Sequence, residues 1–125
     1  MNKTRVLIVD DEEEFANTLA ERLCLRGFDA FSVGNAEEAI SAIKGDRVPD
    51  VALLDLKMPG LSGLDVLQMI KKLEPGIEAI MITGHGSTAS GIEGMKLGLF
   101  DYLMKPVDIN DLVTKINEAM RKKLQ

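Results

Sequence analysis

Short apolar runs alternate with amphipathic stretches about five times along this chain, and the alternation limits the folds that it can adopt. The first run, Arg5–Val9, is rich in β-branched residues and is typical of a buried strand. The stretch Glu13–Arg26 follows, where every fourth residue from Phe15 is apolar until Gly27 ends the helical pattern. Strands alternating with helices predict right-handed βαβ crossovers and a parallel sheet that is covered on both faces.

The rest of the chain continues in the same order. We predict further strands over Phe28–Val33, Val51–Leu56, Ile77–Thr83 and Phe100–Lys105, and further helices over Asn35–Lys44, Leu64–Leu73, Ser87–Leu97 and from Asp108 to about Lys122. Five such units in 125 residues fit an α/β, flavodoxin-like, doubly wound fold: a five-stranded parallel sheet of strand order 2-1-3-4-5, with about five helices on its two faces. We expect residues 1–125 to form one domain.

Composition excludes several classes of function. The formal net charge is -5 and no basic stripe offsets it, so we expect no direct binding of nucleic acid. No apolar run approaches the roughly 20 residues that cross a bilayer, and no signal-peptide pattern precedes the strand-like sequence at Arg5. The single cysteine, Cys24, cannot form an internal disulfide. We therefore expect a soluble cytoplasmic protein that does not bind membranes.

The sulfur-containing residues are expected to be mostly buried. We expect Cys24 to face the core from its helix, and most of the seven methionines to fill the core. Met95 and Met104 could instead serve a partner surface, but the core is the favoured place for both.

Polar residues stand where four of the predicted strands end. They are Asp10, Asp11, Asp55, Thr83 and Lys105. Because the carboxyl ends of parallel strands share one edge of a sheet, we expect these side chains to converge there, where open α/β sheets bind ligands. The set offers a cation site, a nucleophile, a hydroxyl and a counter-charge. These are the parts needed to accept a phosphoryl group.

The acidic residues have a simpler explanation that has to be weighed first. Asp11 alone could be the N-cap of the following helix, with Glu14 completing a capping box. A helix needs only one N-cap residue, so capping does not explain why Asp10 stands beside Asp11. In addition, the three carboxylates of Asp10, Asp11 and Asp55 repel one another when no base is nearby. A divalent cation relieves that repulsion. We expect a shallow Mg²⁺ site, which Mn²⁺ could also fill, because Mg²⁺ prefers oxygen ligands and no Cys/His cluster favours zinc.

The remaining members of the set suit phosphoryl chemistry. Asp55 could merely cap the loop after its strand, but a carboxylate can also attack phosphorus and form an acyl phosphate. The Lys105 ammonium would neutralise charge on the phosphoryl oxygens, and Thr83 could donate its hydroxyl to one of them. A lone lysine is most often a solvated surface residue. Pro106 directly after Lys105 makes that peptide bond a candidate for the cis form, which would direct the amine.

The joint pattern resembles the receiver domain of bacterial two-component response regulators, over essentially the whole chain. The matching segments are Leu7–Asp11, Asp55–Gly60 with Gly63, Ile82–Gly84 and Asp101–Pro106. The resemblance implies that Asp55 is phosphorylated by the phosphohistidine of a sensor histidine kinase. It also implies that Mg²⁺ is held by Asp11, Asp55 and the Lys57 backbone carbonyl, with Asp10 acting directly or through water.

The resemblance further implies how the signal leaves the domain. Thr83 and Tyr102 would form the switch pair, with Thr83 moving toward the phosphoryl group and the Tyr102 ring turning inward. The output would pass through the Ser87–Lys122 region to a downstream protein or output domain, or to a homodimer formed on phosphorylation. Such a protein is a switch rather than an enzyme, apart from slow Mg²⁺-dependent hydrolysis of its own phosphoryl group.

Five second-tier residues carry weaker predictions. Lys57 and His85, two residues beyond Asp55 and Thr83, are expected to tune phosphoryl lifetime; otherwise both are exposed loop side chains. Leu99 stands where the family usually has a small residue, which puts the movement of the tyrosine in question. Gly91 and Gly94 lie inside the Ser87–Leu97 helix, where glycine costs roughly 0.5–1 kcal/mol relative to alanine. They allow either close packing against a neighbour or a soft helix that repacks on phosphorylation.

Three other functions remain to be compared with the switch. A haloacid-dehalogenase-like phosphatase would carry its nucleophile at the end of the first strand, with a second aspartate two residues later. Here the first strand ends in the adjacent residues Asp10 and Asp11, and the predicted nucleophile, Asp55, lies at the end of the third strand. A nucleotide- or flavin-binding module would need a phosphate-cradling loop, but the acidic run 10–14 would repel phosphate without a metal. A receiver used only for docking would not need all five key residues.

Overall fold

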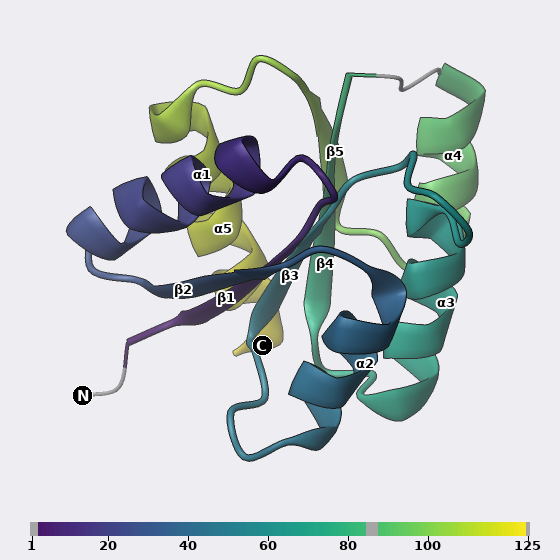
Figure 1. Cartoon of the computed structure of the whole chain (residues 1–125), viewed down its shortest axis with the longest axis horizontal. Helices are drawn as coiled ribbons and strands as arrows, with labels where there is room; N and C mark the ends of the chain where they lie inside the picture. Colours follow the sequence, from purple (N-terminus) through teal and green to yellow (C-terminus); the bar gives the residue numbers. More distant parts are fainter. Residues whose placement is uncertain (1–2, 85–87, 125) are drawn as a thin grey trace.

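Five parallel strands in the order β2-β1-β3-β4-β5 form the centre of the structure, a computed structural model that describes residues 3–84 and 88–124 (Figure 1). The strands are β1 (Arg5–Val9), β2 (Asp29–Val33), β3 (Val51–Leu54), β4 (Glu78–Thr83) and β5 (Asp101–Met104). The helices are α1 (Glu13–Leu25), α2 (Ala36–Lys44), α3 (Gly63–Leu73), α4 (Thr88–Lys96) and α5 (Ile109–Lys123). The predicted fold and strand order are confirmed.

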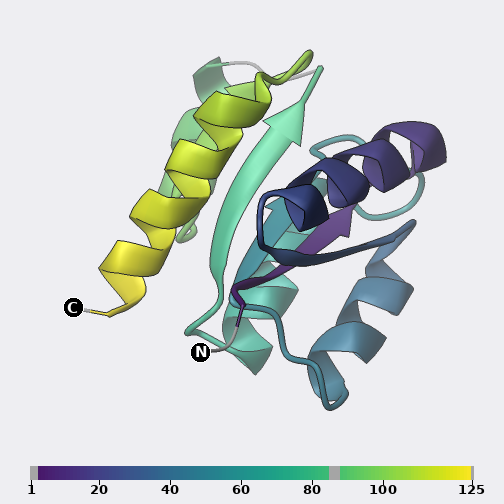
Figure 2. The same ribbon diagram turned by 90° about the vertical axis from the view of Figure 1, so that its left-hand side faces the viewer.

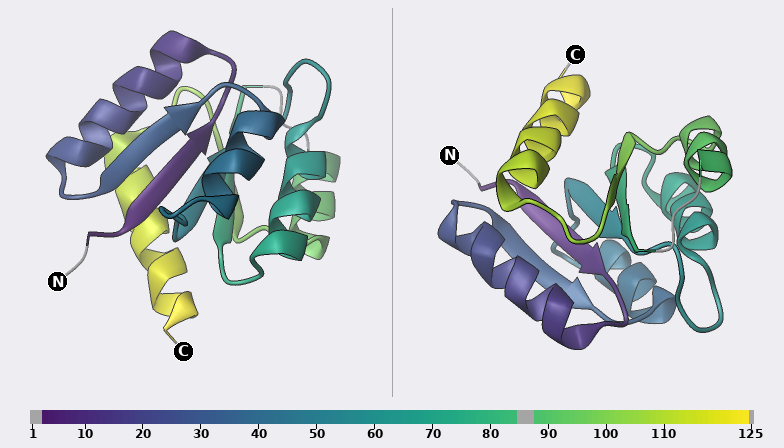
Figure 3. Two further views of the ribbon diagram at one scale, coloured as in Figure 1. Left: turned by 60° about the horizontal axis from the view of Figure 1, so that its bottom comes forward. Right: turned by 90° about the horizontal axis from the view of Figure 1, so that it is seen from above.

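The sheet is covered on both faces. In Figure 1, α1 and α5 lie on one side of it and α2, α3 and α4 on the other, and the views of Figures 2 and 3 agree. Successive strand residues point to opposite faces. Leu7 and Val9 of β1 therefore pack with α2 and α3, while Val6 and Ile8 pack with α1 and α5. Each fully buried side chain of this size stabilises the fold by roughly 1.5–3 kcal/mol.

Side-chain caps fix where three of the helices begin. Asn35 accepts from the Glu38 amide at the start of α2, and Asp108 accepts from the first-turn amides of α5. At the start of α3, Ser62 and Asp65 form a capping box. In α1 the N-cap is Glu12, without a side-chain cap hydrogen bond, so Asp11 does not cap this helix.

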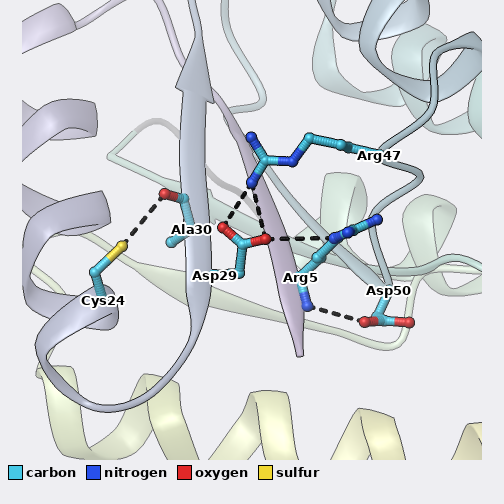
Figure 4. A network of polar contacts seen from close by, with 6 residues as sticks. All are labelled: Arg5, Cys24, Asp29, Ala30, Arg47 and Asp50. Atoms are coloured by element: carbon cyan, nitrogen blue, oxygen red, sulfur yellow. Dashed lines mark hydrogen bonds and ion pairs between the residues drawn. The ribbon is translucent and has the colours of Figure 1, made fainter. Parts of the chain in front are cut away.

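The core positions predicted for Cys24, Met95 and Met104 were wrong, whereas Met58 and Met81 are buried as predicted. Cys24 is exposed, because its neighbour Leu23 occupies the face of α1 that meets the sheet. Its thiol lies 3.4 Å from the Ala30 carbonyl oxygen, to which it donates (Figure 4). Met95 and Met104 are both 48% exposed, because α4 turns Gly94 inward and β5 is an edge strand.

Among the residues that the structure describes, no helix combines the length and the apolar character that crossing a membrane requires.

Candidate functional site

Three aspartates from two neighbouring strands meet at the carboxyl edge of the sheet. Val9 of β1 stands opposite Leu54 of β3, so the residues that follow emerge side by side. Asp10 and Asp55 are each only 3% exposed, whereas Asp11 is exposed. One carboxylate oxygen from each of the three lies within 4.8 Å of the others. The structure thus brings together the acids that the sequence placed at the ends of separate strands.

Asp55 occupies an unusual environment for a carboxylate. Its Oδ1 is buried and has no hydrogen-bond partner among the described residues. Burial, reinforced by the charge of Asp10, raises the pKa of Asp55 above its usual value. The Lys105 charge and hydrogen bonds from the Thr83 hydroxyl and the Lys57 backbone amide oppose that rise. A buried oxygen left without a partner is costly, and it suits a cation or an incoming electrophile.

The donor set fits a hard divalent cation. All three converging groups are carboxylates, which are the ligands that Mg²⁺ prefers, and one of them is exposed to solvent. A hollow of about 340 Å³ opens beside Asp10 and Asp11 and has Ser32 and Glu38 among its lining residues. Such a partly open, polar site leaves room for the water ligands that Mg²⁺ retains.

Lys105 reaches the same site from β5. Its backbone amide donates to the Thr83 carbonyl at 3.0 Å, and the Lys105–Pro106 peptide bond is cis. Its Nζ lies 2.9 Å from Asp10 Oδ2, also donates to Glu12, and sits 4.3 Å from the centre of the Phe15 ring. Burial by itself lowers the pKa of Lys105, but the hydrogen bonds to Glu12 and Asp10 outweigh it and the pKa is raised.

Glu12 and Phe15 are site residues that sequence reasoning missed. The acidic run continuing past Asp11 was the only signal for Glu12, and it was interpreted as a general barrier to phosphate. The helical spacing of Phe15 marks it only as part of an apolar stripe, and its half-buried ring does pack against core residues. The same ring also receives the Lys105 ammonium over its face.

Thr83 and Tyr102 come from the two neighbouring strands β4 and β5. Thr83 is 1% exposed, and its side chain helps to hold the pKa of Asp55 down. Tyr102 stands opposite Met81, two positions before the Thr83–Met104 pair. Its half-buried ring packs against the core cluster on the α2, α3 and α4 side of the sheet.

The loop after Asp55 is held close to the first turn of α3. The Gly63 amide donates to the Leu56 carbonyl at 2.7 Å. A Cβ at Gly63 would overlap the Asp55 carbonyl oxygen and lie 2.9 Å from the Asp55 carbonyl carbon. Only a glycine lets α3 approach Asp55 this closely. Lys57 is exposed in this loop, and His85 lies outside the described residues.

Close packing explains the two glycines of α4. The face that carries Gly91 and Gly94 is buried, and a side chain at either position would overlap Tyr102 or Leu99. Leu99 is itself 4% exposed. Of the two interpretations left open by the sequence, the structure supports packing against a close neighbour.

Comparison with known proteins bears on the identity of the chain. A family model described as the response regulator receiver domain matches residues 6–117. The probable transcriptional regulator ycf27 of Porphyridium aerugineum is 35% identical over 122 residues, which are 98% of this chain and 50% of the relative. The luminescence regulatory protein LuxO of Vibrio campbellii is 36% identical over 115 residues, or 92% of this chain and 25% of the relative. This chain therefore spans half or less of the length of these curated relatives.

Solved structures resemble the chain over nearly its full length. A CheY-like response regulator receiver domain protein from Methanospirillum hungatei JF-1 superposes with a TM-score of 0.91 at 31% identity, covering 98% of this chain and 97% of the other. The receiver domain of NtrX from Brucella abortus gives a TM-score of 0.86 at 31% identity, covering 93% and 98%. With the match to the family model, these likenesses show that the chain belongs to the receiver domains of two-component response regulators.

Proposed function

We propose that Asp55 accepts a phosphoryl group from the phosphohistidine of a sensor histidine kinase, and that the chain changes conformation in response. The observation that carries this proposal is the buried Asp55 Oδ1 without a hydrogen-bond partner among the described residues, next to the carboxylates of Asp10 and Asp11. A carboxylate oxygen kept free of partners at a ligand-binding sheet edge is suited to act as a nucleophile.

The transfer is a single displacement at phosphorus. An Asp55 carboxylate oxygen attacks the phosphorus, the bond from phosphorus to the donor histidine nitrogen breaks, and that nitrogen keeps the electron pair. The product is an acyl phosphate on Asp55. The Thr83 side chain, which already lowers the pKa of this carboxylate, would donate its hydroxyl to a phosphoryl oxygen. The Lys105 ammonium, held by Asp10 and Glu12, already interacts electrostatically with Asp55 and would turn toward the new charge.

Asp10, Asp11 and Asp55 would hold the metal ion, with the Lys57 backbone carbonyl as a further ligand. Mg²⁺ is the proposed ion, with Mn²⁺ as a substitute, because the donors are hard oxygens. When bound, the ion would neutralise the three carboxylates and the phosphoryl oxygens.

Slow attack of water on the acyl phosphate would return Asp55 to its free form. The chain is therefore a switch rather than a turnover enzyme. The side chains of Lys57 and His85 are proposed to set the rate of this step. Unchanged decay rates in Lys57→Ala and His85→Ala would contradict that role.

The output face is proposed to lie within the Ser87–Lys122 region. Three exposed apolar side chains there support it: Ile92 and Met95 on α4 and Met104 on β5, which are 53%, 48% and 48% exposed. Relatives named as a transcriptional regulator and a DNA-binding response regulator are longer than this chain. A downstream protein, an output domain or a second phosphorylated copy would cover this face.

Beryllofluoride with Mg²⁺ tests the proposal, because it binds as a stand-in for a phosphoryl group. Tyr102 is the only tyrosine and the chain has no tryptophan, so its fluorescence reports one position. We expect beryllofluoride to change this fluorescence only when Mg²⁺ is present, and not in Asp55→Asn. No response from the wild-type protein, or an equal response from Asp55→Asn, would contradict the proposal.

A further inference from the structure

The face of α4 that meets β5 carries two glycines where side chains would be expected. Gly91 and Gly94 are three residues apart, so they lie on the same side of the helix, and both are buried. A Cβ built at Gly91 would overlap the Tyr102 ring, at 2.8 Å from Cζ and 2.9 Å from Cδ1. A Cβ at Gly94 would lie 2.9 Å from Leu99 Cδ2. The two large side chains thus fill the space that two side chains of α4 would need.

Among the described glycines, only Gly63, Gly91 and Gly94 would bring an added Cβ within 3.0 Å of another residue, and at Gly63 the atoms met are backbone rather than a large side chain. Elsewhere, a Cβ added at Gly76 would have nothing within 4 Å, and one added at Gly84 would make only an ordinary contact at 3.9 Å. Inside a helix, glycine is unfavourable relative to alanine because it loses more backbone freedom on folding. Two glycines placed under two bulky neighbours therefore let α4 approach Tyr102 and Leu99 more closely than alanine would allow.

We propose that Gly91 is the positioning residue for Tyr102. Its missing side chain forms a seat that holds the ring against the α4 backbone, and Gly94 forms a second seat for Leu99. As a result, the ring cannot leave its seat without opening a gap under α4, and α4 cannot move closer without displacing the ring. The helix and the tyrosine change position together. The seat is argued from the contacts of Gly91 and Gly94 alone. The signalling role of the joint movement rests in addition on the proposed function.

A double-mutant cycle tests the seat without any phosphoryl group. We expect Gly91→Ala to lower the urea midpoint of unfolding in the wild-type background, because the added methyl group meets the ring. In the Tyr102→Ala background the same change is expected to raise the midpoint, because the ring is gone and alanine favours the helix. The sign of the shift thus reverses. Gly76→Ala is the matched control and should shift both backgrounds equally.

A shift of the same sign and size in both backgrounds would overturn the proposal. Should Gly91→Ala fail to fold, recovery of folding by Tyr102→Ala supports the seat, and failure in both backgrounds counts against it. The second pair gives an independent cycle. The effect of Gly94→Ala on the urea midpoint is expected to change when Leu99→Ala is also present, because Leu99 is the neighbour that the methyl group meets. It is expected not to change with Tyr102→Phe, which keeps the ring.

Tyrosine fluorescence then distinguishes the packing of Tyr102 against Gly91 from the response of Tyr102 to phosphorylation. In Gly91→Ala, acrylamide is expected to quench Tyr102 more strongly than in the wild-type protein, because the displaced ring is more exposed. Beryllofluoride with Mg²⁺ should then change the quenching less in this variant than in the wild-type protein. If beryllofluoride leaves wild-type Tyr102 unchanged, the proposed function fails while a coupled double-mutant cycle still supports the seat. Equal quenching of the two unliganded proteins would overturn the seat itself.

Discussion

The buried carboxylate of Asp55 is expected to lower the stability of the folded protein. Its carboxylate is buried beside Asp10, with one oxygen lacking a partner among the described residues. Asp55→Asn removes the charge and keeps the shape. Without divalent cations, we predict that this variant has the higher free energy of unfolding, by about 1 kcal/mol, the scale of one unsatisfied buried group. Urea titrations in a chelator measure it.

Mg²⁺ provides the control for that experiment. A ligand that binds only the native state stabilises it by mass action. Added Mg²⁺ is therefore expected to raise the midpoint of wild-type unfolding more than that of Asp55→Asn, and so to reduce the difference. An equal Mg²⁺ effect on the two proteins would show that Asp55 is not part of the cation site.

Glu12 competes for the Lys105 ammonium. In the structure Lys105 is shared between Asp10 and Glu12, although its expected role is to meet the phosphoryl group. Glu12→Gln should leave Asp10 as the only one of these two charged partners and raise the affinity for beryllofluoride a few-fold at saturating Mg²⁺. An ion pair with a partner as exposed as Glu12 is worth at most about 1 kcal/mol. Glu14→Gln, which removes the same charge from the first turn of α1, is the control. Unchanged or weaker binding in Glu12→Gln would contradict this competition.

Among the helices, the contact of α3 with the loop that follows Asp55 depends on Gly63. The Gly63→Ala methyl group would overlap the Asp55 backbone carbonyl. We predict a loss of roughly 1–3 kcal/mol in the free energy of unfolding, typical of overpacking, together with slower phosphorylation of Asp55. Urea titration and phosphorylation time courses measure the two effects. Gly76→Ala has open space around it and should be neutral in both. Wild-type behaviour of Gly63→Ala would show that this close approach is not needed.

The elements themselves were predictable from hydrophobic periodicity, but their ends were not. The strand predicted over Val51–Leu56 ends at Leu54, because its partner strand ends at Val9 and pairing stops there. The helix predicted from Leu64 begins at Gly63, because the Ser62 capping box sets its first turn. Pairing and capping, rather than apolar character, decide where an element stops.

The sheet topology of the whole molecule made the position of the site predictable, whereas the contacts between its side chains were not. The meeting of Asp10, Asp11 and Asp55 follows from strand order alone, since parallel strands deliver their ends to one edge. The hold of Glu12 on Lys105 depends on rotamers of side chains 93 residues apart. The exposure of Met95 depends on which face α4 turns inward. No pattern in the sequence encodes those two features.

A separate polar network joins the strands at the opposite edge of the sheet, where Arg5 of β1 stands beside Asp29 of β2 (Figure 4). Arg47 Nη2 lies 2.8 Å from both carboxylate oxygens of Asp29, and Arg5 Nε lies 3.3 Å from one of them. The hydrogen bond from Arg47 is the main reason that the pKa of Asp29 falls below its ordinary value of 3.8.

The lowered pKa fixes the pH range in which this network stabilises the fold. Its contribution is present above the unfolded-state pKa of 3.8 and is lost as the pH falls through the lower folded-state pKa. We predict that Asp29→Asn loses less than about 1 kcal/mol of unfolding free energy at neutral pH, because the groups are partly exposed. The difference from the wild-type protein should vanish in acid. Urea titrations across pH check this, and a difference that persists or grows in acid would contradict it.

Phosphorylation of Asp55 is the central claim, and one measurement tests it most directly. The chain is incubated with acetyl phosphate, and the intact protein and its peptides are weighed by mass spectrometry. We expect one phosphoryl group per chain, located on Asp55, formed when Mg²⁺ is present and not formed when a chelator is added before acetyl phosphate. Asp55→Asn should gain none. A phosphoryl group on another residue, equal incorporation when the chelator is added before acetyl phosphate, or no incorporation into the wild-type protein would contradict the account.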